Sequence, residues 1–356
     1  MGPGSPSIPA TGSEVSRKTR PRYSDCMARA LVIGGTLFIG RALVRRLLAR
    51  GDEVTILHRG KANPFGDKAE ELHCDRNDTA AIAAALEGGQ WDLVFDNVYD
   101  WARGTTSAQV EAAARTCPAG LRRYVFTSSV AAYGEGLDRD EDDPLAAPDF
   151  ADVYCRNKAE TERMLFRLHR ESGFPAVTVR PPYVYGPENP FYREAFFWDR
   201  ILAERPVLVP GDGQRLMQFV LADDIARAAL LACEEEAAIG RAYNIAAPRA
   251  ISQNELVTAL AQAAGREVRM VHVPREKLVE LGGQVFQPPF YFGQYFDMEP
   301  ITQRIDRARA ELGFEPTPFE AGLQATFEWY VGQDAQERPT PDFSYDEKAL
   351  EAIGAV

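Results

Sequence analysis

The stretch ALVIGGTLFIGRALVRRLLARG, residues 30–51, places a short apolar strand, a glycine-rich turn and an amphipathic helix in direct succession. Five apolar residues of the helical part share one face: Ile39, Leu43, Val44, Leu47 and Leu48. Gly51 ends the helix. Glycine lets backbone amides approach a pyrophosphate closely, and a helix N-terminus offers partial positive charge to phosphates. The stretch therefore predicts a dinucleotide-binding unit, with an ordinary tight turn as the alternative.

Strand-like and helix-like runs alternate after this stretch. Strands are expected at Ala30–Ile33, Glu53–Leu57, Glu70–His73, Asp92–Phe95 and Arg123–Thr127, with helices at Thr79–Leu86 and Ser107–Arg115. This alternation predicts an α/β fold of the Rossmann type, a doubly wound parallel sheet. After about residue 180 the alternation loosens. We expect loops at 181–191 and 206–214, helices at Gln253–Ala264 and Thr302–Leu312, and a smaller, mostly C-terminal substrate lobe.

Four segments are expected along the chain: a disordered leader at 1–26, a Rossmann domain at 27–180, a substrate lobe at 181–330 that partly returns to the core, and a tail at 331–356. The 356 residues are 45% hydrophobic and carry a net charge of −12, and removing the leader, with four basic and two acidic residues, leaves −14. Such a charge makes nucleic acid an unlikely main ligand. No run approaches 18 uncharged apolar residues, so no membrane-spanning helix is expected.

Neither the cysteines nor the histidines are spaced along the sequence as metal ligands usually are. The five cysteines are far apart and form no CxxC pair, which indicates a reducing compartment and favours a cytoplasmic protein. The four histidines are also not spaced as ligands, and the acidic run 138–144 is interpreted as a solvated loop. No metal site is expected. The aromatic run 286–296 is interpreted as core or lid packing, with a base-stacking platform as the alternative.

The expected cofactor residues begin with the glycine loop, Gly34, Gly35, Thr36, Leu37, Phe38, Ile39 and Gly40. Leu37 stands where the usual spacing has a middle glycine. The second strand ends in His58 and Arg59, where an acidic residue would bind the ribose hydroxyls of NAD. A guanidinium suits a 2′-phosphate, which favours NADP, although Arg59 could equally stack on adenine or point to solvent. Asp75 is placed to meet the adenine edge, or is an ordinary turn residue.

Two further segments carry the chemistry. Ser128 and Ser129 follow the strand that ends at Thr127, and Tyr154 and Lys158 lie four apart, on one face of a predicted helix. A free tyrosine titrates near 10, but a nearby ammonium and a nicotinamide cation favour its phenolate. Tyr154 can then exchange a proton with an alcohol as hydride moves, while Ser129 hydrogen-bonds the same oxygen.

With these motifs in place, the chain from about Ala28 to Trp329 resembles an extended short-chain dehydrogenase/reductase of the nucleotide-sugar epimerase/dehydratase kind. The GGTLFIG variant is similar to an atypical subgroup that includes the chloroplast stem-loop-binding proteins. The resemblance implies a homodimer and a second-lobe strand and helix at 218–228. It also implies further cofactor contacts from Arg76 and Pro181, and substrate contacts from Ser129, Tyr183 and Asn189. Asn97 and Val98 stand where the family usually has small residues beside the cofactor, so their contacts with it are expected to differ from the family's. Met217 stands where the family places an arginine, and the nearby Arg215 is expected to contact the nucleotide diphosphate in its place.

The two residues after the active-site serine limit which of the family's reactions this chain is expected to catalyse. Related dehydratases carry an Asp-Glu pair at the positions of Val130 and Ala131, and related decarboxylases carry a Glu at the second position. Without that acid/base pair, the resemblance implies an NAD(P)-dependent epimerase that acts on a nucleotide sugar through a keto intermediate, with tightly held NAD. An NADP-dependent reductase or dehydrogenase of a sugar or related alcohol uses the same three residues and stays open. So does an RNA-binding protein on the same scaffold.

Overall fold

The computed structural model describes residues 27–60, 63–283, 296–334, 338 and 340–355. Its centre is a seven-stranded sheet in the order β12-β7-β5-β4-β1-β2-β3, with every neighbouring pair parallel. The strands are β1 (Arg29–Ile33), β2 (Glu53–His58), β3 (Glu70–His73), β4 (Leu93–Asp96), β5 (Arg123–Thr127), β7 (Ala176–Arg180) and β12 (Arg241–Asn244). The predicted doubly wound α/β fold is confirmed.

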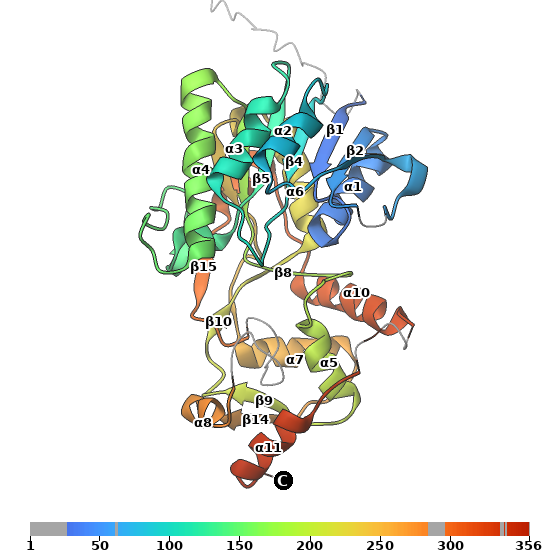
Figure 1. The fold of residues 1–356 in the computed structure, drawn as a ribbon. Helices are drawn as coiled ribbons and strands as arrows, with labels where there is room; N and C mark the ends of the chain where they lie inside the picture. Colours follow the sequence, from blue (N-terminus) through green and yellow to red (C-terminus); the bar gives the residue numbers. More distant parts are fainter. Residues whose placement is uncertain (1–26, 61–62, 284–295, 335–337, 339, 356) are drawn as a thin grey trace, which may run out of the picture.

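Two helical layers cover the sheet (Figure 1). One face packs against α1 (Phe38–Arg50), α6 (Ala222–Glu234) and α9 (Asp306–Leu312). The other face packs against α2 (Thr79–Leu86), α3 (Ser107–Thr116) and α4 (Val153–Ser172). Because both faces are buried, the central strands are almost continuously apolar, as ALVI and YVF illustrate. Because β1, β4 and β5 run parallel, their carboxyl ends lie side by side at one edge of the sheet.

A second part of the molecule lies beyond that edge (Figure 1). Its core is built from α5 (Glu194–Leu202), β9 (Val207–Pro210), α7 (Gln253–Ala263), β14 (Met270–Val273), α8 (Arg275–Glu280), α10 (Phe319–Gly332) and α11 (Ser344–Ala352). Short paired strands join the two parts: β6 (Gly136–Arg139) with β15 (Ile301–Gln303), β8 (Tyr183–Tyr185) with β11 (Phe219–Leu221), and β10 (Leu216–Met217) with β13 (Ile251–Ser252). The 3₁₀ turns are η2 (Gly66–Lys68), η3 (Val130–Tyr133) and η4 (Glu236–Ala238).

Several boundaries differ from the sequence-based expectation. The expected loops at 181–191 and 206–214 contain β8 and β9, and the helix expected from Thr302 begins only at Asp306, because 301–303 pairs with β6. The helix within 218–228 is α6, which packs on α1 over the sheet and not in the second part. Residues after 331 include α11, whose Leu350 joins the second core, so this segment is not a tail. The leader 1–26 and most of the aromatic run lie outside the described residues, but Phe296 is buried. Among the described helices, none is long and apolar enough to cross a membrane.

Candidate active site

The glycine loop has a geometry that larger residues would not permit. Gly34 has φ +87°, and a Cβ there would lie 2.3 Å from Cγ2 of Val98. A Cβ on Gly40 would lie 1.9 Å from the carbonyl oxygen of Gly34, because α1 starts directly against the end of β1. A side chain at either position would collide with Val98 or with the backbone of Gly34, so only glycine permits so tight a turn between β1 and α1.

The N-terminus of α1 forms the other half of this candidate pyrophosphate site. Its N-cap, Leu37, makes no side-chain capping hydrogen bond, and the first turn contains no acidic residue. Leu37 is 53% exposed, and Phe38 adopts the left-handed φ of 43°. Nearby, at the end of β4, the buried amide nitrogen Nδ2 of Asn97 has no hydrogen-bond partner among the described residues. An uncapped helix end and an unpaired buried donor both fit a bound dinucleotide.

Charged residues at the expected adenosine end are engaged with one another. Arg59 and Arg103 both contact the carboxylate of Asp100, at 3.3 and 2.7 Å, and Arg103 also contacts Asp75 at 2.7 Å. A backbone hydrogen bond from Asn77 is the main cause that lowers the pKa of Asp75, and Arg103 adds to it. Arg59 is largely exposed, so its guanidinium remains within reach of a ligand.

Arg76 does not have the role that the resemblance implied. Its side chain is buried, with Nη2 on the carboxylate of Asp96 and Nη1 donating to the carbonyl oxygen of Gln109 at 2.8 Å. Asp96 also accepts from the hydroxyl of Tyr124 at 2.8 Å. The guanidinium therefore neutralises a carboxylate inside the sheet, and we withdraw the assignment of this side chain to adenine.

Tyr154 and Lys158 lie on α4 where it passes the end of β5. The ammonium nitrogen Nζ of Lys158 donates to the carbonyl oxygen of Thr127 at 2.7 Å and lies 5.7 Å from the ring centre of Tyr154. Lys158 is 4% exposed, and this burial lowers the pKa of its ammonium to about 8, although Asp96 and Glu162 oppose the effect. The spacing thus places a sheltered cation beside the phenol.

Ser129 is the second residue after β5, at the strand end where the sequence placed it. It is 8% exposed, and its hydroxyl accepts a hydrogen bond from the backbone amide of Ala131 at the start of η3. The amide of Val130 donates to the carbonyl oxygen of Pro181 at 2.9 Å, which joins this turn to the chain after β7. The neighbouring Ser128 points elsewhere, because its hydroxyl donates to Glu162 at 2.5 Å.

Glu162 is the centre of a buried polar cluster behind the site. Its carboxylate also accepts from Arg180, at 2.6 Å from Nη2, and from the hydroxyl of Thr178 at 3.1 Å. All these side chains are buried in the sheet–α4 interface. The cluster fixes the part of α4 that carries Lys158, one turn before Glu162.

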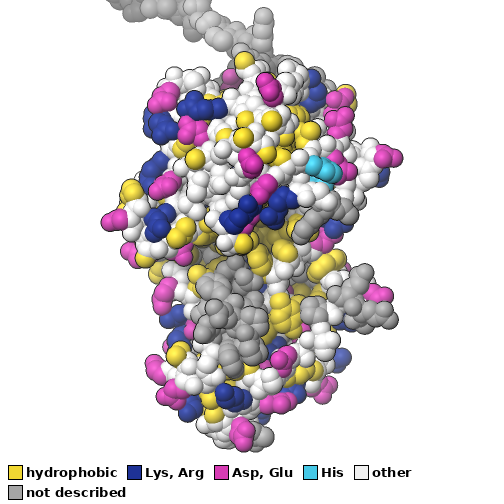
Figure 2. Space-filling model, in the orientation of Figure 1, with side chains coloured by type: hydrophobic (Ala, Val, Ile, Leu, Met, Phe, Trp, Pro, Cys, Tyr) yellow, Lys and Arg dark blue, Asp and Glu magenta, His cyan; other side chains and the backbone are white. Residues whose placement is uncertain are grey.

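An aromatic group above Tyr154 was not predicted from the sequence. The ring of Trp101 stacks on Tyr154 at 4.9 Å and 29°, Tyr99 meets Tyr154 edge-on at 4.7 Å, and Phe191 meets Trp101 at 6.1 Å. Trp101 is 58% exposed. The only sequence signal was two aromatic residues, Tyr99 and Trp101, shortly after the strand that ends at Asp96. Hydrophobic side chains also gather at the junction of the two parts in Figure 2.

The residues expected to bind substrate are dispersed over this junction. Tyr183 lies on β8, half-buried beside Phe219, and Asn189 donates from Nδ2 to Glu194 at 2.7 Å. Arg215 donates to the carbonyl oxygen of Asp297 and to the carboxylate of Glu299, both at 2.7 Å. These hydrogen bonds engage Asn189 and Arg215 within the second part.

Comparison with known proteins gives a consistent picture. Residues 30–246 match the model of the NAD dependent epimerase/dehydratase family. The chain is 28% identical over 341 residues to the chloroplast stem-loop binding protein of 41 kDa b of Arabidopsis thaliana, which covers 90% of this chain and 84% of that one. It is 24% identical to a UDP-N-acetyl-alpha-D-glucosaminuronate decarboxylase of Bacillus cytotoxicus, over 85% of this chain and 97% of that one.

Solved structures share the fold. A UDP-glucose 4-epimerase from Thermotoga maritima, solved with UDP-glucose, superposes with a TM-score of 0.66 at 24% identity and covers 85% of this chain and 98% of its own. A UDP-glucose 4-epimerase from Thermus thermophilus, in complex with NAD, gives 0.67 at 22% identity and covers 86% of this chain and 100% of its own.

Proposed function

The chain belongs to the NAD dependent epimerase/dehydratase family, and from that premise we propose that it is an NAD(P)-dependent epimerase acting on a nucleotide sugar. One observation carries the proposal: the buried ammonium of Lys158 lies 5.7 Å from the ring centre of Tyr154 and donates to the carbonyl oxygen of Thr127 at the end of β5, two residues before Ser129 and two strands from the glycine loop. In a doubly wound sheet this edge is where a dinucleotide and its substrate meet.

The residues present fit a nicotinamide dinucleotide. The loop 35–40 and the uncapped end of α1 would hold its pyrophosphate, and Asn97 offers a buried unpaired donor. When bound, the cofactor supplies a hydride acceptor and donor. Tyr154 removes the proton from the sugar hydroxyl and returns it, and the Lys158 ammonium favours its phenolate. Ser129 hydrogen-bonds the same sugar oxygen and stabilises charge that develops there.

The neighbouring residues favour epimerisation over elimination. Val130 and Ala131 occupy the turn after Ser129, so no carboxylic acid stands there to protonate a leaving hydroxyl. An epimerase needs only hydride removal, rotation of the keto intermediate and hydride return. The aromatic group of Tyr99, Trp101 and Phe191 offers flat apolar surfaces beside Tyr154 on which a sugar ring can turn.

The test combines cofactor identification with a single substitution. Protein purified gently is denatured, and released dinucleotide is identified by mass spectrometry; retained NAD supports the epimerase. Tyr154→Phe should abolish interconversion of UDP- or dTDP-hexose isomers while dinucleotide content stays unchanged. Tyr345→Phe is a matched control, since that buried hydroxyl donates to Leu278 in the second part. Normal turnover by Tyr154→Phe would refute the assigned base.

Two other functions are kept as candidates, each on a specific observation. The exposed Arg59 at the end of β2 favours an NADP-dependent reductase, which an empty site that accepts NADPH would support.

The 28% identical relative named as a stem-loop binding protein favours RNA binding. The net charge of −12 counts against that second candidate. Saturable RNA affinity at physiological salt, where phosphate-driven binding weakens, would support it. We also propose a cytoplasmic homodimer, which light scattering and cell fractionation test.

A further inference from the structure

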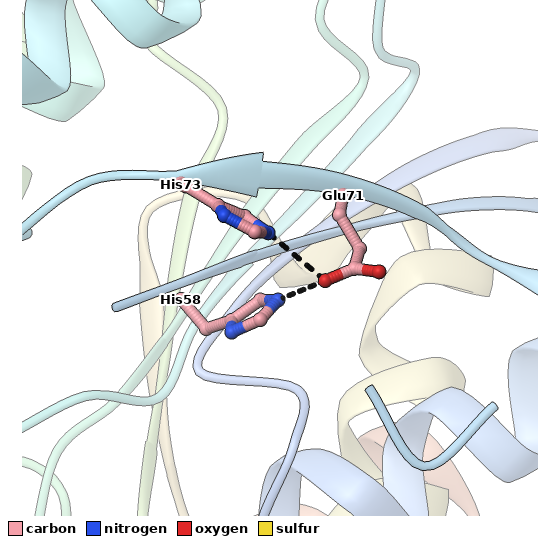
Figure 3. A group of neighbouring side chains, drawn as sticks. All are labelled: His58, Glu71 and His73. Carbon is pink, nitrogen blue, oxygen red and sulfur yellow. Dashed lines mark hydrogen bonds and ion pairs between the residues drawn. The ribbon is translucent and has the colours of Figure 1, made fainter. Parts of the chain in front are cut away.

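Two histidines and a glutamate converge at the open edge of the sheet, away from Tyr154. In the parallel register of β2 and β3, His58 is opposite His73, and Glu71 is opposite Ile56. Side chains two apart on a strand share a face, so all three lie on one side of the sheet. Figure 3 shows both imidazole rings pointing at the same carboxylate. The sequence spacing of the histidines concealed this cluster, because strand register creates it.

The three side chains present their ligand atoms to one point. Nε2 of His58 lies 2.7 Å and Nε2 of His73 lies 2.9 Å from the same oxygen, Oε2 of Glu71. All three ligand atoms lie within 4.8 Å of one another. The site therefore offers two imidazole nitrogens and one carboxylate oxygen to a common point.

We propose that His58, Glu71 and His73 form a binding site for a divalent transition-metal ion, with Zn²⁺ as the ion that the donors fit best. Two imidazole nitrogens and one carboxylate oxygen are a common three-residue set for zinc, with a fourth position open to water. Tetrahedral ligands at 2.0–2.1 Å are about 3.3–3.4 Å apart, so the two hydrogen-bonded contacts need to open by about 0.5 Å. Harder ions such as Mg²⁺ and Ca²⁺ prefer all-oxygen ligands.

The burial of the three groups suits a fixed yet accessible site. The side chain of His58 is 4% exposed and held between β1 and β3, whereas those of Glu71 and His73 are 34% and 57% exposed on the edge strand. One ligand is therefore preorganised, and the other two can make the small adjustment. An ion can reach them from solvent without any rearrangement of the sheet.

One feature limits the expected affinity. When Nε2 of a neutral imidazole binds a metal, the ring proton resides on Nδ1, and such protons usually have an acceptor. Nδ1 of His58 is buried and has no hydrogen-bond partner among the described residues. We therefore expect binding that is specific but weaker than in zinc sites whose histidines have such acceptors.

The experiment measures metal binding directly on the full chain, so its result is independent of enzymatic activity. Protein stripped with a chelator is titrated with Zn²⁺ by calorimetry and with Co²⁺ by absorption spectroscopy. We expect one saturable equivalent, a tetrahedral Co²⁺ spectrum, and no thiolate-to-cobalt charge-transfer band. His73→Ala and Glu71→Gln should each weaken the affinity at least about tenfold.

A matched control is available in the second part. His272 is exposed, and its Nε2 lies 2.9 Å from the amide oxygen of Asn254, with no carboxylate bonded to it among the described residues, so His272→Ala should leave Zn²⁺ affinity unchanged. Thermal unfolding of each variant without metal verifies that the edge strand is intact. Absence of saturable binding by the parent chain would overturn the proposal. Equal affinity in folded His73→Ala, or a thiolate band indicating that Cys74 is the ligand, would overturn it too.

Discussion

Replacing Lys158 by methionine should inactivate the enzyme and stabilise the fold. The ammonium lies in the sheet–α4 interface at 4% exposure, where burial lowers its pKa from 10.5 to about 8. A lysine that binds its proton less tightly when folded than when unfolded destabilises the folded state at neutral pH. Methionine keeps the length of the side chain and removes the charge.

The magnitude follows from the pKa and one hydrogen bond. The difference between 10.5 and about 8 corresponds to about 3.4 kcal/mol of destabilisation at pH 7. The ammonium also donates to the carbonyl oxygen of Thr127 at 2.7 Å, and loss of a charged hydrogen bond costs about 1.5–3 kcal/mol. We therefore expect Lys158→Met to be more stable than the parent chain by about 0.5–2 kcal/mol at pH 7.

The stability difference between Lys158→Met and the parent chain should shrink as the pH rises. Below pH 8 both folded and unfolded lysine are protonated, so the destabilisation is complete. Between pH 8 and 10.5 the folded state releases its proton while the unfolded state keeps it, and stability of the parent chain rises relative to the variant. The difference should change by up to about 1.4 kcal/mol per pH unit in this window, then become constant.

The assay is urea unfolding of cofactor-free protein, followed by tryptophan fluorescence at pH 7, 8, 9 and 10. Comparing the two proteins at each pH cancels the titration of the groups that do not interact with Lys158. The reasoning would be refuted if Lys158→Met were less stable at pH 7 and the difference from the parent chain did not change up to pH 10. Turnover should be lost in the variant at every pH.

Three other substitutions test separate parts of the site. Gly40→Ala should abolish dinucleotide binding in a fluorescence titration, because its Cβ would lie 1.9 Å from the carbonyl oxygen of Gly34. Gly120→Ala is the control, since a Cβ there has nothing within 4 Å, and equal binding by both variants would contradict the pyrophosphate site at the glycine loop. Glu162→Gln should lower the free energy of unfolding by about 3–5 kcal/mol, since Arg180 would be left buried without its counter-charge; a loss under about 1 kcal/mol in urea unfolding would argue against the cluster. Trp101→Ala should reduce kcat/KM up to about tenfold in the isomerase assay, with unfolding unchanged, as loss of one aromatic stack on Tyr154 implies; unaltered kinetics would exclude a role in substrate binding.

Much of the fold and the reactive group follows from local sequence. The stretch 30–51 encodes its strand, turn and helix through apolar periodicity and glycine placement, which are properties of neighbouring residues. Tyr154 and Lys158 could be paired because helical spacing alone puts residues four apart on one face. Local sequence was less informative where short strands pair at the junction: β8 and β15 exist only because a distant partner satisfies their backbone.

Other features were decided by tertiary structure alone. Arg76 looked available for adenine in the sequence, yet from the turn after β3 it is buried against Asp96, twenty residues away at the end of β4. The stacking of Trp101 on Tyr154 requires the loop after β4 to meet the start of α4. The meeting of His58, Glu71 and His73 depends on the register of β2 against β3. The sequence determines which residues can form strands and helices, since that depends on spacing along the chain. The packing of the two helical layers on the sheet decides which distant side chains meet. The physical reason is that burial and strand register depend on residues that are far apart in the sequence.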